Sequence, residues 1–196
     1  MDHHLTLQTA PDTEPITLAE FKSHIDYTAS DRDTYLGTLI AAARRYCEQR
    51  TYRSLYTQTW QLALDCFPGN LGTILLPRGP VASVTSVGYT DTNGDAQTVD
   101  SENYQLDNNR EPARLAPARA CTWPATDPDT LAAVKITYVA GWDDVADIPA
   151  DYKHAIKLLA SHWFENPSAV TVEGTPKYVP MTVRLLLDPN DYSPPV

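Results

Sequence analysis

Residues 30–51 carry the longest helical periodicity in the chain. Apolar residues recur there at steps of three and four, which places them on one stripe of a helix. The stripe consists of Leu36, Leu39, Ile40, Ala43, Tyr46 and Cys47. The charged residues, Arg44 and Glu48 among them, fall on the polar positions. Such a helix spans roughly 30 Å at about 1.5 Å per residue, so other parts of the chain must cover its apolar side.

Three further segments have the pattern of helices. Residues 149–166 form a second long stripe, with Tyr152, Ile156, Leu159 and Trp163 on one face, and we expect it to pack against 30–51. A shorter helix is predicted over 17–26, where Thr17 and Glu20 have the spacing of a capping box. Ser30 to Asp33 resembles a second cap. The run Met181 to Leu187 predicts a last, short apolar helix.

Within residues 57–141 the apolar residues recur every second residue, instead of every 3.6 residues as in the predicted helices. Trp60, Leu62 and Leu64 alternate with polar or small residues, which is typical of a half-buried strand. Asn93-Gly94 between two such runs is the sequence of a hairpin turn, and 134–140 is the last clear strand. The connections are too short for helical crossovers, so the strands are expected to be antiparallel.

These patterns predict an α+β fold: a small α-helical bundle of about four helices, with a large antiparallel β insertion (about 57–141) between the second and third helices. Residues 1–15 have no periodicity and are interpreted as an extended or mobile N-terminal arm. Residues 16–166 are expected to form a single domain. Residues 167–196 are expected to form a C-terminal loop, the short helix and a tail.

Composition excludes several classes of protein. The 25 acidic and 15 basic residues give a formal net charge of −10, which argues against a DNA-binding surface built on phosphate neutralisation. The charge indicates solubility, or a surface that nucleic acid slides past without adhering. Three cysteines without CxxC spacing suggest neither a disulfide framework nor a zinc site. No apolar run approaches the roughly 20 residues of a membrane span.

Enzymatic signatures are missing from the sequence, which contains no GxSxG, GxxxxGK[ST], GxGxxG or HExxH motif. His162 and Glu165 are three residues apart and share a helix face with the spacing of a metal pair, with His154 nearby. A metal site would need further acids on a facing helix, and 30–51 offers Glu48 alone near its inward side. Asp91 to Asp95 has the wrong spacing for a calcium loop, and a hairpin turn explains it. We therefore predict no catalytic, cofactor-binding or metal-binding residues.

The order and spacing of seven segments resemble the head-tail connector, or adaptor, proteins of long-tailed bacteriophages and gene transfer agents. The segments are Pro15–Lys22 (PITLAEFK), 31–44 (DRDTYLGTLIAAAR), 57–62 (TQTWQL), 76–84 (LPRGPVASV), 123–126 (WPAT), 134–142 (VKITYVAGW) and 148–156 (IPADYKHAI). One departure is the end of the chain: relatives often finish a Leu-Leu segment with a basic residue, whereas Leu187 is followed by Asp188.

The resemblance implies a structural virion protein of the neck, at the head-tail interface, assembled in the host cytoplasm. It implies a homo-oligomeric ring, commonly a dodecamer, which binds the portal protein, extends the DNA channel and docks the next stopper, neck or tail protein. It leaves open whether the free protein is a monomer. DNA would pass through the channel without specific binding, and no cofactor, membrane or catalysis is implied.

Contact residues are expected where apolar side chains lie outside the core pattern. The candidates for subunit or portal contact are Leu5, Leu7, Val179, Met181, Leu185, Leu186 and Leu187. Two other functions remain open at this point. One is a module that binds carbohydrate or peptide through the β insertion, with Trp60, Tyr89 and Trp142 as an aromatic patch. The other is a metal hydrolase that uses His154, His162 and Glu165.

Overall fold

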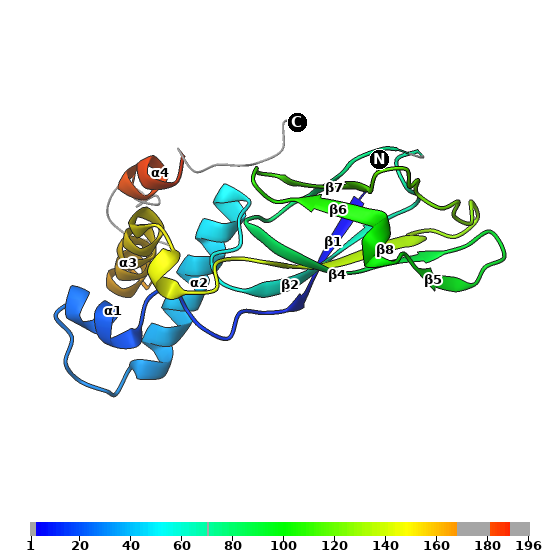
Figure 1. Cartoon of the computed structure of the whole chain (residues 1–196). Coiled ribbons are helices and arrows are strands. Elements are labelled where there is room, and N and C mark those ends of the chain that lie inside the picture. The colour runs from blue at the N-terminus through cyan, green and yellow to red at the C-terminus, as the bar shows by residue number, and fades with distance from the viewer. Residues whose placement is uncertain (1–2, 70, 168–180, 189–196) are drawn as a thin grey trace. The chain divides into compact units, whose positions relative to one another are not determined.

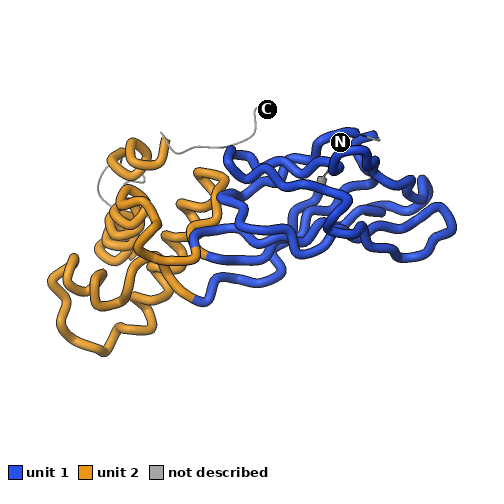
Figure 2. The backbone as a smooth tube through the Cα atoms, viewed as in Figure 1, with its two compact units in different colours: residues 1–12, 57–142 blue, residues 13–56, 143–196 orange. Residues whose placement is uncertain are grey.

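The computed structural model describes residues 3–69, 71–167 and 181–188. The chain forms two compact units (Figure 2). Unit 1 comprises residues 1–12 and 57–142, and unit 2 comprises residues 13–56 and 143–196. The chain therefore passes between the units three times. The predicted α+β class is confirmed: the described residues include four α-helices, and a strand-rich region lies between the second and third (Figure 1). That residues 16–166 form a single domain stays a prediction.

Unit 2 is built on two long helices, α2 (Asp33–Thr51) and α3 (Ala150–Glu165), which pack against each other as predicted. Their apolar stripes are buried, with Leu36 and Leu159 completely inside. Tyr46 and Trp163 lie half-buried at the seam, their rings edge to face at 6.5 Å. The Tyr46–Trp163 contact joins two residues that the sequence pattern places on facing stripes.

Two shorter helices complete unit 2. Helix α1 (Leu18–His24) begins with the predicted capping box: the Glu20 amide donates to the Thr17 hydroxyl, and the Glu20 carboxylate accepts from the Thr17 amide at 2.7 Å. Helix α4 (Met181–Leu187) packs on α3 and also contacts α2. A 3-10 turn, η2 (Val145–Asp147), precedes α3.

The predicted cap at the start of α2 is wrong. The helix begins at Asp33, with Arg32 at the N-cap position and no side-chain cap. The acids that suggested a cap have other partners, because the Asp31 carboxylate accepts from the Tyr27 hydroxyl and Asp33 pairs with Lys22 at 2.7 Å. Both contacts hold α1 and its following turn against the beginning of α2.

The sequence pattern places Arg44 and Glu48 at polar positions of α2, with Glu48 near the inward side, and the structure buries both. Both side chains are only 9% exposed, and the Arg44 Nη1 and Glu48 Oε2 atoms are 2.6 Å apart. Arg44 Nε donates to Glu14 at 2.8 Å, and the other Glu48 oxygen accepts from the Leu55 amide at 2.9 Å. A buried charge is tolerated when it is paired in this way. The network joins α2 to the segments that precede α1 and follow α2.

Unit 1 contains two antiparallel sheets. The larger has the strand order β1 (His3–Thr9), β2 (Gln58–Leu64), β8 (Val134–Ala140), β4 (Val81–Thr90), β5 (Ala96–Thr98). The smaller has the order β3 (Ile74–Leu76), β7 (Ala113–Pro117), β6 (Tyr104–Asp107), with a 3-10 turn η1 (Ser101–Asn103) before β6. One core contains buried residues of both sheets, including Leu62, Ile136 and Leu115. The Phe67 and Trp123 rings stack within it at 4.7 Å.

The predicted N-terminal arm includes a strand of this sheet. Residues 3–9 pair with β2, with Leu5 opposite Leu62 and Leu7 opposite Trp60. Leu5 packs against the core of unit 1. The two leucines are the only apolar side chains on the strand, which is too short an alternation to be recognised as a strand in the sequence.

Strand β4 contains two irregularities that explain its unusual sequence. Val81, Val84 and Val87 are spaced by three residues, which does not fit the two-residue period of a regular strand. The register to β8 shifts between Val81 and Ser83 and again between Val84 and Ser86. Each shift inserts one extra residue, as a β-bulge does. The bulges bring all three valines onto the core face of the sheet.

Candidate interaction surfaces

Helix α4 presents two different faces. Val183 and Leu187 are completely buried, whereas Met181 and Leu185 are 77% and 66% exposed. Asp188 pairs with Arg50 of α2 at 2.8 Å just beyond the helix. Of the predicted contact residues, Leu187 thus anchors α4 within unit 2, and Met181 and Leu185 form the exposed apolar face. Leu186 lies between the two faces, and Val179 lies outside the described residues.

The other predicted contact residues lie on β1, at the edge of the larger sheet. Leu5 is half-buried against the core, while Leu7 is 42% exposed. On its other side β1 has no partner strand among the described residues. Such an edge presents backbone donors and acceptors that can pair with another chain.

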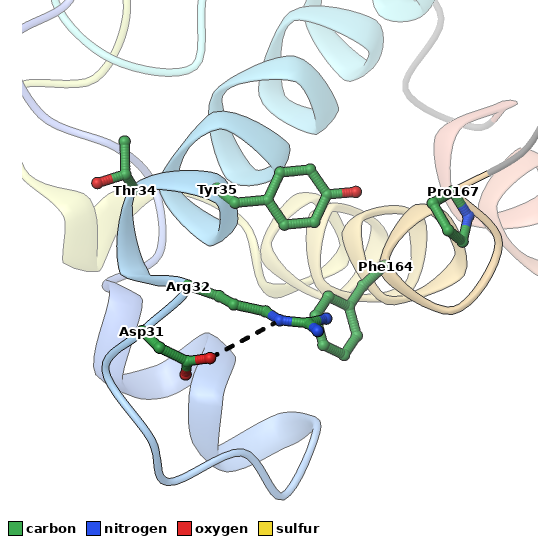
Figure 3. A pocket seen from close by; sticks show the side chains of 6 residues that line it. All are labelled: Asp31, Arg32, Thr34, Tyr35, Phe164 and Pro167. Carbon is green, nitrogen blue, oxygen red and sulfur yellow. Dashed lines mark ion pairs between the residues drawn. The ribbon is translucent and has the colours of Figure 1, made fainter.

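A shallow pocket of about 540 Å³ lies in unit 2 between the beginning of α2 and the end of α3 (Figure 3). Figure 3 shows the Arg32 side chain extending along the Phe164 ring, with the guanidinium carbon 5.9 Å from the ring centroid. Tyr35, which is 41% exposed, and Pro167 also line the opening. The pocket therefore offers aromatic surface beside one cation, an arrangement that suits aromatic or proline side chains of a protein partner.

A second pocket, of about 350 Å³, lies on the outer face of the smaller sheet. Its polar lining includes Gln105 and the ion pair of Arg114 with Asp107, whose nitrogen and oxygen are 2.6 Å apart. The hydrogen bond from Arg114 lowers the pKa of Asp107 below its usual value. Leu75, opposite Arg114 in the register, is 52% exposed. Since its charges are paired internally, this surface is largely neutral.

The hairpin interpretation of Asp91 to Asp95 is confirmed. The Asp91 carboxylate accepts from the Asn93 and Asp95 amides at 2.9 and 3.1 Å, and Gly94 has a φ of 84°. These backbone hydrogen bonds, that of Asn93 foremost, lower the pKa of Asp91. The acids at this turn therefore close the loop between β4 and β5.

The candidate metal ligands do not form a cluster. Among the described residues no three His, Cys, Asp or Glu side chains lie close enough together to hold a metal ion. His154 lies instead beside His24, with the two ring centroids 6.4 Å apart. Two of the aromatic residues considered for ligand binding make contacts within unit 1. Trp60 and Tyr89 pack against the core of unit 1, and Arg78 lies over the Trp60 ring.

The sequence pattern predicts neither pocket. Tyr35 and Phe164 are remote in sequence, and only the packing of α2 on α3 brings them together. The exposed face of α4 had a signal, because Met181 and Leu185 are four residues apart and Val183 and Leu187 likewise.

Among the described residues no helix is both long and apolar enough to cross a membrane.

Comparison with known proteins gives matches among solved structures. No protein-family model matches the chain, and no curated protein matches it either. A chain in the neck of an empty gene transfer agent particle, computed with C6 symmetry, has a TM-score of 0.77 and 24% identity, with 98% of this chain and 97% of that chain covered. Chains of the virion of the native particle and of its neck computed with C12 symmetry give TM-scores of 0.76 and 0.75, with the same identity and coverage. The chain therefore shares its fold, over almost its whole length, with a protein of these particles.

Proposed function

We propose that this chain is a structural protein of a virion neck, a head-tail connector that forms a ring beneath the portal and docks the next neck or tail protein. The observation that carries the proposal is the fold shared with a chain of gene transfer agent necks over 98% of this sequence. A likeness limited to one unit would support only a common module. Here both the helical unit and the two-sheet unit are included.

The symmetry of the matched particles supports a ring. Their necks were computed with C6 and C12 symmetry, which is consistent with six or twelve copies of a protein around the channel. A closed ring requires two different surfaces on each subunit that fit each other. The edge of β1, the exposed face of α4 and the two pockets supply candidate surfaces of this kind. The contact roles of Leu7, Met181 and Leu185 are part of this proposal.

The role is non-catalytic. The connector holds the portal and the tail-side protein by many copies of a modest contact, whose combined strength rises steeply with the number of copies. The excess of acidic residues repels the phosphate backbone of DNA, so that the duplex passes the ring without adhering. No step of this function requires a cofactor or a metal.

Electron microscopy and sedimentation of the purified protein, alone and mixed with its portal, test the proposal. The expected result is a ring, or portal particles that carry one extra layer of density. A protein that remains monomeric at every concentration and does not associate with the portal would refute the proposed function. A monomer in isolation that joins the portal would support it, because such a ring can assemble on the portal as a template.

A further inference from the structure

The outer face of the larger sheet in unit 1 lacks carboxylates, although the unit is acidic. By sequence, unit 1 has eleven Asp and Glu residues against five Lys and Arg. The registers define three rows of outward side chains across the strands. The rows are Thr9-Thr59-Val139-Ser83, Thr6-Gln61-Thr137-Ser86 and His4-Ala63-Lys135-Gly88-Thr98. None of these described positions is Asp or Glu, and Lys135 is the one Lys or Arg.

These rows, which we call the neutral face, are accessible to a partner. Every residue in them is exposed or half-buried, whereas the opposite face of the same strands forms the core with the smaller sheet. Sheet surfaces that only meet water commonly carry charged residues, since they maintain solubility. Apart from Asp107 in β6, the described acids of unit 1 lie in turns and loops, as with Asp91 and Asp95 at the β4–β5 hairpin.

The neutral face continues into an edge strand without protection. Natural edge strands usually carry lysines, prolines or inward-pointing charges that prevent pairing with another chain. Strand β1 has the sequence HHLTLQT, which contains no proline and no Asp, Glu, Lys or Arg. An unprotected edge beside a face without carboxylates is typical of a surface that is covered in an assembly.

We infer that the neutral face and the β1 edge contact a second copy of this chain in the ring. The argument rests on charge and on the proposed function. Two copies of an acidic protein repel each other, and like charges brought together at an interface cost several kcal/mol. Adjacent copies therefore approach most easily where at least one contributes a surface without carboxylates. The contact is heterologous, as ring closure requires, so a different surface of the next copy covers the face.

The size of the neutral face predicts a weak single contact. The three rows cross four strands about 4.8 Å apart, and the third row also reaches β5 at Thr98. The four shared strands cover roughly 20 by 15 Å. This is well below the ≈ 800 Å² per partner of a standard stable interface, even with the β1 edge added. Isolated dimers are thus expected to be scarce, and the contact contributes through repetition around the ring.

The test compares Thr137→Glu with Thr137→Gln, two variants of nearly equal size that differ in charge. Thr137 is half-buried on the central strand β8, in the middle row. Thr92→Glu, at the exposed tip of the β4–β5 hairpin, adds the same charge outside the face. Circular dichroism confirms folding, and Ser86→Glu on the neighbouring strand repeats the test if Thr137→Glu does not fold.

Ring formation is measured by sedimentation velocity and electron microscopy, with and without the portal. We expect Thr137→Glu to raise the concentration for half-assembly by about tenfold or more, equivalent to 1.4 kcal/mol. Thr137→Gln and Thr92→Glu should assemble like the wild type. Normal rings from Thr137→Glu would overturn the inference and leave the proposed function standing. Normal rings that no longer bind the portal would assign the face to the portal and also overturn it. A wild type that never assembles would overturn both.

Discussion

Removal of one charge from the buried Arg44–Glu48 pair is expected to destabilise unit 2 more than any other loss of a single charge. The Arg44 side chain is only 9% exposed. Removal of the Glu48 carboxylate leaves the Arg44 guanidinium paired with Glu14, whose side chain is 31% exposed. Breaking a buried pair costs about 3–5 kcal/mol. Loss of the acceptor for the Leu55 amide adds about 1–3 kcal/mol, since Leu55 is completely buried.

We therefore expect Glu48→Ala to lower the free energy of unfolding by about 4 kcal/mol, because Glu14 retains part of the compensation. Glu48→Gln keeps one oxygen for the Leu55 amide but loses the charge and the second acceptor, which faces Arg44, and should cost about 2 kcal/mol. Urea unfolding followed by circular dichroism at 222 nm, where the helices dominate, measures both values. Scanning calorimetry shows whether the loss falls on one transition or on all.

The control is a double replacement. Arg44→Met with Glu48→Leu removes both charges and fills the space with apolar atoms, so it should be less destabilising than Glu48→Ala alone. Glu14→Gln, at the more exposed end of the network, should cost less than Glu48→Gln. If Glu48→Gln changed the free energy of unfolding by less than about 0.5 kcal/mol, the usual range of surface substitutions, the network would not stabilise the fold as argued.

Three further predictions concern other parts of the chain. Burial raises the pKa of the Cys47 thiol to about 12. A thiol reagent at pH 8 should therefore modify the exposed Cys66 rapidly and Cys47 only on unfolding. Mass spectrometry of the modified peptides checks the order of modification. Leu185→Asp, on the exposed face of α4, should change the melting temperature by no more than about 2 °C while impairing assembly. Val183 is completely buried, so Val183→Asp should unfold α4. Equal loss of stability in both variants would contradict the assignment of faces. The pKa values of Asp91, Asp107 and Asp127 are lowered in the fold by hydrogen bonds, from Asn93, Arg114 and Thr130 first. Their stabilisation is present above the unfolded value of 3.8 and is lost as the pH falls through the lower folded values. Acid titration should thus show level stability from pH 7 to about 5 and a decline below about pH 4, and Asp107→Asn should reduce that decline.

The sequence predicted the parts of the fold that depend on one segment at a time. Helices α2 and α3, the Thr17 capping box and the Asn93-Gly94 hairpin each have a complete local signal, and each was found where expected. Strand β1 had no such signal, because it has seven residues and only two leucines. Its conformation depends on pairing with β2, which is remote in sequence.

The errors share a physical cause. The pattern places Arg44 and Glu48 at polar positions of the helix, yet both are buried, and each neutralises the other at a spacing of four residues. Asp31 and Asp33 suggested a helix cap and instead bind Tyr27 and Lys22. In both cases a specific side-chain partner decided the outcome, and the polar and apolar pattern alone does not identify such partners. Two of them are remote in sequence: Glu14 for Arg44 and Lys22 for Asp33. The neutral face, likewise, becomes visible only when the register aligns four strands that are far apart in sequence.

The two bulges of β4 give this strand spare length. Deletion of Ala82 would leave Val81 and Ser83 as consecutive partners of Ala140 and Val139, and deletion of Thr85 would do the same for Val84 and Ser86 beside Tyr138 and Thr137. Either loss converts a bulge into regular pairing without turning a single valine away from the core. Homologous genes that differ by one codon here can therefore encode the same sheet, and alignments should tolerate a gap at these two positions before they tolerate one anywhere in β8.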